Sequence, residues 1–199
     1  MRDKANNGAK PGAISFSAAQ SLVDEIGRLN AQIARLTRQV GELEQLAHMD
    51  SLVRLPNRRG LFRDLKNVIA RLNRCGGSAA MIFVDVDGLK QINDRCGHPT
   101  GDAVLIRIAE ILVASVRASD TVARLSGDEF VVLLTDVDEL GAWNMALRLV
   151  EATVASPPSI NNHYVPLSIA VGVSAISKGD EPEDIISRAD NAMYRMKTP

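Results

Sequence analysis

The sequence predicts an α+β fold in which helices pack on a mainly antiparallel sheet, preceded by a long coiled-coil helix. Three observations support this class. Apolar residues recur at heptad spacing before position 50, and helix-like and strand-like segments alternate after it. The stretch 122–134 is apolar on both sides of a Ser-Gly bend, which is typical of a β-hairpin. A sheet built from such segments must be covered by the helices around it.

The composition is that of an ordinary soluble globular protein. The 199 residues are 46% hydrophobic and 24% charged, with a formal net charge of -1. Without a basic excess, nucleic acid is not an expected partner. The sequence holds no apolar run of about 18 residues and no export signal, so we expect a cytoplasmic protein that does not insert into a membrane. Cys75 and Cys96 lack metal-ligand spacing and are expected to be reduced.

The first part of the chain has a narrow apolar stripe. Its positions alternate in steps of four and three, which is the a/d seam of a heptad repeat. The seam consists of Leu22, Ile26, Leu29, Ile33, Leu36, Val40, Leu43 and Ala47. Such a stripe favours a parallel homodimer, although an isolated amphipathic helix could instead fold back on its own domain.

The chain is expected to divide near residue 50. Residues 1–16, which include Gly8, Pro11 and Gly12, should be flexible. They would suit a linker from an upstream sensor domain or an artificial chain end. Residues 17–49 form the coiled-coil helix. Residues 50–199 form a folded domain of about 150 residues, which is enough for one hydrophobic core.

The elements beyond residue 50 are expected in alternation. A helix at 59–74 and a buried strand at 79–86 come first, followed by a helix at 103–116 and the hairpin at 122–134. A helix at 138–155, a strand at 164–176 and a closing helix at 182–196 complete the domain.

Acidic residues stand where the predicted strands end. Asp85 and Asp87 close the first strand, and Asp128 and Glu129 lie at the bend of the hairpin. Hard divalent ions such as Mg²⁺ prefer a few carboxylate oxygens together with phosphate and water, and two such ions would suit phosphoryl transfer. The loop that ends in Lys90 adds backbone N–H groups and a cation, as a triphosphate requires. The plainer alternative is that the aspartates cap a strand end and that the lysine is solvated.

Five ordered blocks of residues carry a family resemblance. They are Leu55-Pro56-Asn57-Arg58-Arg59, Asp85-Val86-Asp87-Gly88-Leu89-Lys90-Gln91-Ile92-Asn93-Asp94, Gly97-His98-Pro99-Thr100-Gly101-Asp102, Ser126-Gly127-Asp128-Glu129-Phe130, and Arg188-Ala189-Asp190-Asn191-Ala192-Met193-Tyr194. Together they resemble the GGDEF domain, the diguanylate cyclase module of bacterial signalling. The resemblance implies a sandwich similar to the palm of nucleotide cyclases and polymerases, a signalling role for the helix at 17–49, and a catalytic domain at 50–199.

The resemblance implies a metal site with catalytic carboxylates. Two Mg²⁺ ions, for which Mn²⁺ could substitute, should be held by Asp85, the backbone carbonyl of Val86, and Asp128. Glu129 should lie beside them, as a further ligand or as an aid to deprotonating the attacking 3′-hydroxyl. Asp85, Asp128 and Glu129 are therefore the expected catalytic residues.

The same resemblance assigns the nucleotide contacts. Asn93 and Asp102 should hydrogen-bond the guanine edge, and the carboxylate of Asp102 favours GTP over ATP. Lys90, Gly127 and Lys197 should contact the phosphates. Capping of helices and turns is the alternative role for Asn93 and Asp102, and both lysines could simply be solvated.

The implied reaction condenses two GTP molecules into cyclic di-GMP and releases two pyrophosphates. Each domain would bind one GTP, so two domains must face each other. A coiled coil would raise the local concentration of the second domain, and a change in the coil could switch the pair between productive and unproductive arrangements.

Arg117 and Asp120 indicate a second site. Their Arg-x-x-Asp spacing shortly before the signature resembles the inhibitory site of the family, where the product cyclic di-GMP binds. Arginine offers a planar fork to phosphate or guanine, and the carboxylate can accept from guanine N–H groups. By itself the motif is common and usually means an ion pair at a helix end.

Several positions depart from the family pattern. Ser126 replaces the first glycine of the signature, so we expect reduced rather than abolished catalysis. Val53-Arg54 stands where the family usually has Thr-Gly, and Leu89 where it usually has Phe. The second functional candidate is therefore a catalytically weak or inactive GGDEF module that serves as a receptor for cyclic di-GMP or GTP. The retained acidic residues favour the enzyme.

Overall fold

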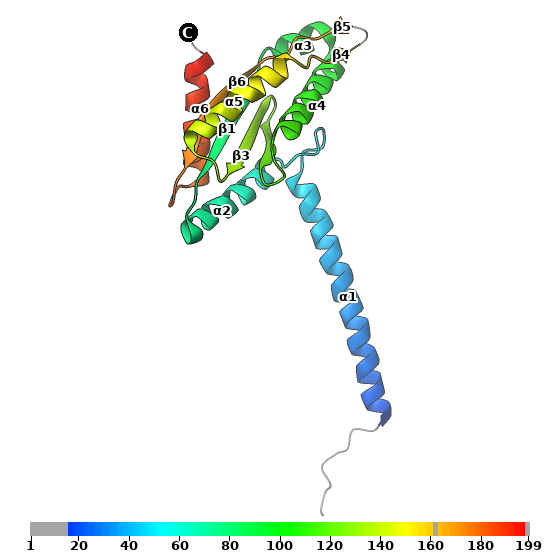
Figure 1. Ribbon diagram of the computed structural model, residues 1–199. Coiled ribbons are helices and arrows are strands. Elements are labelled where there is room, and N and C mark those ends of the chain that lie inside the picture. Colours follow the sequence, from blue (N-terminus) through cyan, green and yellow to red (C-terminus); the bar gives the residue numbers. More distant parts are fainter. Residues whose placement is uncertain (1–15, 161–162, 198–199) are drawn as a thin grey trace, which may run out of the picture. The chain divides into compact units, whose positions relative to one another are not determined.

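The computed structural model describes residues 16–160 and 163–197 (Figure 1). The chain separates into two compact units, Met1–Leu46 and Ala47–Pro199. Apart from Phe16, the segment expected to be flexible lies outside the described residues. Among the described residues, no helix is both long enough and apolar enough to cross a membrane.

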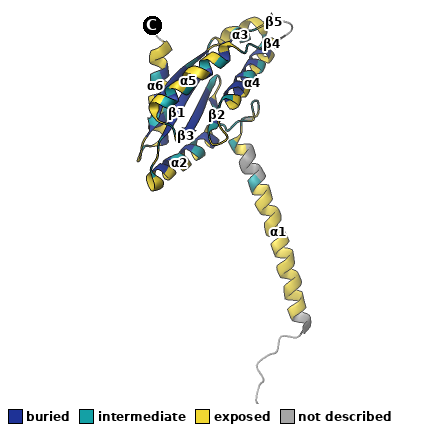
Figure 2. Cartoon of the chain, in the orientation of Figure 1, coloured by how far each residue is buried: buried dark blue, intermediate teal, exposed yellow. Residues whose placement is uncertain are grey.

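The described part of the first unit consists of the long helix α1 (Phe16–His48), whose last two residues belong to the second unit. Its seam residues Leu22, Ile26, Leu29, Ile33, Leu36 and Val40 are all between 44% and 61% exposed. The side chain of Leu43 lies outside the description. Figure 2 shows the described part of this helix almost entirely exposed, in contrast to the strands of the second unit. The heptad stripe is thus an apolar surface available to a partner.

The second unit is an α+β sandwich, as the sequence predicts. Its elements are α2 (Arg58–Cys75), β1 (Ala79–Val86), α3 (Leu89–Cys96), α4 (His98–Ser115), β2 (Thr121–Ser126), β3 (Glu129–Thr135), α5 (Glu139–Val154), β4 (Ser159–Ile160), β5 (His163–Tyr164), β6 (Ile169–Ile176) and α6 (Pro182–Lys197). Four strands form one antiparallel sheet in the order β2-β3-β1-β6, and β4 pairs with β5. Strands β1 and β3 are therefore the two central strands, and the end of β1 lies beside the start of β3.

Helices cover both faces of this sheet (Figure 1). Along β1, Ile82 and Val84 pack into one core with α4 and α5. Met81 and Phe83 point the other way, into a second core with α2 and α6. Since both faces are buried, β1 is an unbroken apolar run up to Asp85.

Local chemistry sets several boundaries of the elements. Asn57 caps α2, since its side-chain oxygen accepts from the backbone N–H groups of Arg59 and Gly60 at 2.9 and 3.1 Å. Gly172 in β6 lets α6 approach closely, because a Cβ there would lie 2.2 Å from the carbonyl oxygen of Ala189. This approach brings the end of α6 to the edge of the sheet.

Two predictions of secondary structure are wrong in detail. Helix α3 was not predicted, and α4 begins at His98 rather than at residue 103. Gly97, at φ 82°, separates the two helices, and a proline in the first turn of α4 is compatible with a helix start. The strand predicted at 164–176 is two strands, β5 and β6, separated by residues 165–168. Pro166 lies in that gap and has no backbone N–H for a ladder.

Candidate active site

Four predicted site residues meet where β1 ends and β3 begins. Asp85 stands opposite Glu129 in the antiparallel register, so their side chains leave the same face of the sheet. The N–H of Val86 donates to the carbonyl of Asp128 over 3.0 Å. The pairing of β1 with β3 therefore gathers residues that are more than forty positions apart in the sequence.

The signature turn, residues 126–129, connects β2 to β3. Gly127 has φ 29°, and the register of β2 shifts just before the turn, between Arg124 and Ser126. The Ser126 hydroxyl donates to Glu129 Oε2. Among the described residues, only Arg54 and Asp136 combine a side chain with positive φ, so Ser126 is accommodated without that backbone strain.

Arg124 connects the signature turn to the junction loop, residues 49–57. Its Nε and Nη2 atoms donate to the carbonyl of Gly127 at 3.0 and 2.7 Å, while Nη1 is 3.1 Å from Asp50 Oδ1. The two side chains of this ion pair are 13% and 22% exposed. Asp50 also accepts from the N–H groups of Leu52 and Val53 at 3.0 Å. The Arg124 guanidinium therefore holds the carbonyl of Gly127, the residue that immediately precedes Asp128.

Burial alone would raise the pKa of Asp50. The N–H groups of Val53 and Leu52 and the charge of Arg124 outweigh it and hold the pKa below its usual value. Sequence analysis did not identify Asp50 or Arg124. Arg124 lies on a strand that runs into the signature, which was an available signal, whereas nothing local to Asp50 marks a partner 74 residues away.

Lys197 approaches Asp85 from the last turn of α6. Its ammonium forms an ion pair with Asp85 Oδ1 and lies 3.5 Å from Asp87 Oδ1. Burial lowers the pKa of Lys197, but the hydrogen bond to Asp85 and the charges of both aspartates raise it overall. Lys197 is thus a cation held at the carboxylates where phosphate charge would be neutralised.

The oxygen atoms at this edge suit a hard divalent ion. Within residues 16–160 and 163–197, no three His, Cys, Asp or Glu side chains gather as a self-sufficient metal centre. Mg²⁺ commonly binds through one or two carboxylates and completes its shell with phosphate oxygens and water. Asp85, Asp128 and the carbonyl of Val86 therefore fit an ion that binds together with a nucleoside triphosphate.

Asn93 and Asp102 belong to the neighbouring helices α3 and α4. A Cβ on Gly101 would lie 1.9 Å from Asn93 Oδ1, so the amide packs directly on the backbone that precedes Asp102. Asn93 Oδ1 is buried and has no hydrogen-bond partner among the described residues. An unpaired buried amide oxygen is costly and calls for a partner. Asp102 is exposed.

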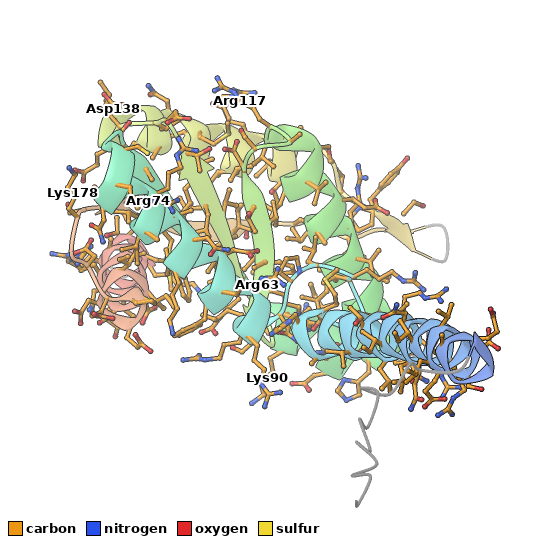
Figure 3. The ribbon with its side chains drawn as sticks, turned by 90° about the horizontal axis from the view of Figure 1, so that it is seen from below. Arg63, Arg74, Lys90, Arg117, Asp138 and Lys178 are labelled. Atoms are coloured by element: carbon orange, nitrogen blue, oxygen red, sulfur yellow. The ribbon has the colours of Figure 1, made fainter. Side chains whose placement is uncertain are left out.

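Lys90 is an exposed residue of α3, just beyond Gly88. Figure 3 shows its side chain projecting from the body of the domain. In the same view Arg117 lies at the opposite edge, beyond the sheet. The two basic residues thus lie on opposite sides of the second unit.

Arg117 and Asp120 precede β2, whereas the signature turn begins at its last residue. Six residues of strand separate the two ends, or about 20 Å. The Asp120 carboxylate accepts from the backbone N–H groups of Arg117 at 3.1 Å and Thr135 at 3.3 Å. Asp120 therefore fixes the turn between α4 and β2, a role that sequence analysis did not assign, and Arg117 remains exposed.

Comparison with known proteins gives this arrangement a family. Residues 47–199 match the family described as diguanylate cyclase, GGDEF domain. The bifunctional diguanylate cyclase/cyclic di-GMP phosphodiesterase MucR of Pseudomonas aeruginosa is 39% identical over 170 residues, covering 85% of this chain and 24% of MucR. Diguanylate cyclase TpbB of the same organism is 37% identical over 182 residues, covering 89% of this chain and 40% of TpbB.

Solved structures agree with the sequence comparison. The GGDEF domain of TpbB superposes with a TM-score of 0.71 at 35% identity and covers 75% of this chain and 88% of that domain. Diguanylate cyclase SiaD of P. aeruginosa, solved in complex with its activator SiaC, superposes with a TM-score of 0.74 at 27% identity and covers 92% of this chain and 70% of SiaD.

The chain belongs to the GGDEF diguanylate cyclase family. It spans between 24% and 40% of the length of the two curated relatives above. The expected family and fold class are thereby confirmed, and the individual residue roles remain proposals.

Proposed function

We propose that this chain is an active diguanylate cyclase that condenses two GTP molecules into cyclic di-GMP. The observation that carries the proposal is the convergence of Asp85, Asp128 and Glu129 at the ends of two adjacent strands, with Lys197 beside them. Carboxylates and a cation at one edge match the needs of phosphoryl transfer, which are metal coordination and neutralisation of phosphate charge. A degenerate receptor would have no need to keep all of these groups.

Each residue has a distinct proposed task. Asp85, the Val86 carbonyl and Asp128 would hold two Mg²⁺ ions, which would supply Lewis-acid activation of the ribose hydroxyl when bound. Glu129 lies beside them, as a further ligand or as the group that helps to deprotonate the 3′-hydroxyl. Lys197, which lies beside Asp85 and Asp87, would be available to contact the phosphates when the metal site is filled.

The nucleotide contacts follow from the neighbouring helices. Guanine is the proposed partner for the side-chain amide of Asn93, because an amide suits a base edge that offers both donors and acceptors. The nearby carboxylate of Asp102 accepts from the same edge and rejects adenine, which cannot match it. Lys90 and the backbone of Gly127 complete the phosphate contacts.

Two domains must meet for this reaction, and we assign that task to α1. Its exposed seam would bury apolar surface if a second copy packed against it, and we therefore propose that the chain forms a homodimer. At the far end of β2, the exposed side chain of Arg117 is proposed to bind the product cyclic di-GMP and thereby to inhibit the enzyme. Asp120 contributes there by shaping the turn that presents this arginine.

The test is incubation of the purified chain with GTP and Mg²⁺, with products resolved by chromatography. We expect cyclic di-GMP from the unaltered chain and a rate at least about a hundredfold lower for Asp128→Ala, the size typical of losing one electrostatic stabiliser. Glu183→Ala, an exposed acidic change in the first turn of α6, is the matched control and should keep the full rate. No product, with cyclic di-GMP binding retained in calorimetry, would favour the receptor instead.

The same assay tests the other assignments. Replacing Leu29 and Leu36 by lysine should lower the rate per domain at low protein concentration and restore it at high concentration. Arg117→Ala should remove inhibition by added cyclic di-GMP, and Asp102→Ala should lower the preference for GTP over ATP. Unchanged behaviour in any of these variants rejects the corresponding assignment.

A further inference from the structure

A row of polar side chains crosses three strands at the active-site edge of the sheet. Ser126 on β2 pairs with Glu129 on β3, and Glu129 pairs with Asp85 on β1. Residues directly opposite on antiparallel strands share a face, with Cβ atoms about 4.5–5.5 Å apart. Glu129 therefore stands between a hydroxyl on one side and a second carboxylate on the other.

Ser126 reaches this position because of a β-bulge. The register shifts between Arg124 and Ser126, which leaves Leu125 as the extra residue on β2. In a regular ladder, Leu125 would stand opposite Glu129. The bulge instead places a hydrogen-bond donor opposite the carboxylate and leaves Leu125 in the core with α2 and α6.

The hydroxyl is well placed to hold Glu129. It donates to Glu129 Oε2, while the charge of Asp85 is balanced by Lys197. Like charges on directly opposite residues repel, so a carboxylate next to Asp85 needs a partner to keep one orientation. Ser126 and Gly127 also line an open pocket of about 490 Å³, so this side of the turn faces solvent.

We infer that Ser126 is a positioning residue whose hydroxyl holds the Glu129 carboxylate in the orientation that the reaction uses. The inference rests on the proposed cyclase function. It reverses the expectation that serine at this position lowers catalysis, which was based on glycine's use where the backbone approaches a ligand closely or adopts positive φ. Here the positive φ belongs to Gly127, so the serine adds a hydrogen bond without backbone strain.

The kinetic test compares Ser126→Ala, Ser126→Gly and Ser126→Thr. Alanine and glycine remove the hydroxyl, and kcat should fall about tenfold with the KM for GTP almost unchanged, because a lost hydrogen bond to a charged group affects the reacting arrangement rather than nucleotide binding. Threonine keeps the hydroxyl and should restore most of kcat. Ser177→Ala is the matched control, since this exposed serine follows β6 at the opposite end of the sheet.

A second measurement works without turnover. In the nucleotide-free protein, NMR three-bond couplings from Glu129 Cγ to its backbone N and carbonyl carbon report whether the side chain keeps one χ1 rotamer. We expect one rotamer in the unaltered chain and in Ser126→Thr, and averaging among rotamers in Ser126→Ala and Ser126→Gly.

The two measurements separate failure of the inference from failure of the proposed function. An equal or higher kcat in Ser126→Ala, or unchanged couplings in that variant, overturns the positioning role. If the unaltered chain makes no cyclic di-GMP, the proposed function fails. In that case the couplings alone decide whether Ser126 orients Glu129.

Discussion

The junction loop and the signature turn each carry a larger residue where related domains usually have glycine, yet the consequences differ. Arg54 in the junction loop has φ 54°, a left-handed conformation that is unfavourable for a residue with a side chain. Ser126 in the signature turn avoids positive φ, and its hydroxyl gains a hydrogen bond. The local backbone, not the substitution itself, decides whether losing a glycine is costly.

These two regions are also physically joined. Arg124 bonds Asp50 in the junction loop and the carbonyl of Gly127 in the signature turn. A structural change in the junction loop can therefore shift Gly127, which is next to Asp128, through the side chain of Arg124.

The largest loss of stability is expected when the contacts of Arg124 with Asp50 and Gly127 are removed. Arg124→Ala leaves the partly buried Asp50 without its cation and frees the Gly127 carbonyl, so the free energy of unfolding should fall by about 2–3 kcal/mol. Urea denaturation measures it, and cyclase activity should fall as well. Arg71→Ala breaks an ion pair whose side chains are 46% and 66% exposed, and should cost no more than about 1 kcal/mol. Equal losses in the two variants would mean that Arg124 has no special structural role.

The same contact predicts a response to acid. The folded state lowers the pKa of Asp50, so its ionised form contributes stability above the ordinary pKa of an aspartate, about 4. That contribution is lost as pH falls through the lower, folded-state pKa. Asp50→Asn should therefore be less stable than the unaltered chain at neutral pH, and the difference should shrink in acid. Denaturation curves from pH 7 down to about pH 3 give the result, and a difference independent of pH would contradict it.

The smallest change in stability is expected at Arg54, where the left-handed conformation can be tested directly. Arg54→Gly should relieve about 1–2 kcal/mol of left-handed strain and lose about 0.5–1 kcal/mol through the greater freedom of the unfolded chain. The net gain in unfolding free energy should be about 0–1.5 kcal/mol by the same two estimates. Arg54→Ala keeps the Cβ and should gain nothing. At the other position, Ser126→Gly should bring no gain in stability, because no strain exists there to relieve.

Much of the fold could be predicted because its signals are local. The heptad seam on α1, the apolar run of β1 and the hairpin of β2 and β3 all follow from residues close together in sequence. Helix α3 was missed because it has only eight residues between Gly88 and Gly97. Pro166 divides a strand that apolar content alone made continuous.

The sequence by itself determined the carboxylates at the strand ends, the exposed seam and the family, since each is a pattern of neighbouring residues. Only the tertiary structure decided which charges meet. Arg124 and Asp50 are 74 positions apart, and Lys197 and Asp85 are 112 apart. Residues so far apart in sequence come into contact only when the helices pack on the sheet. The single-residue bulge that turns Ser126 toward Glu129 arises in the same way, because strand register is set by packing across the whole sheet.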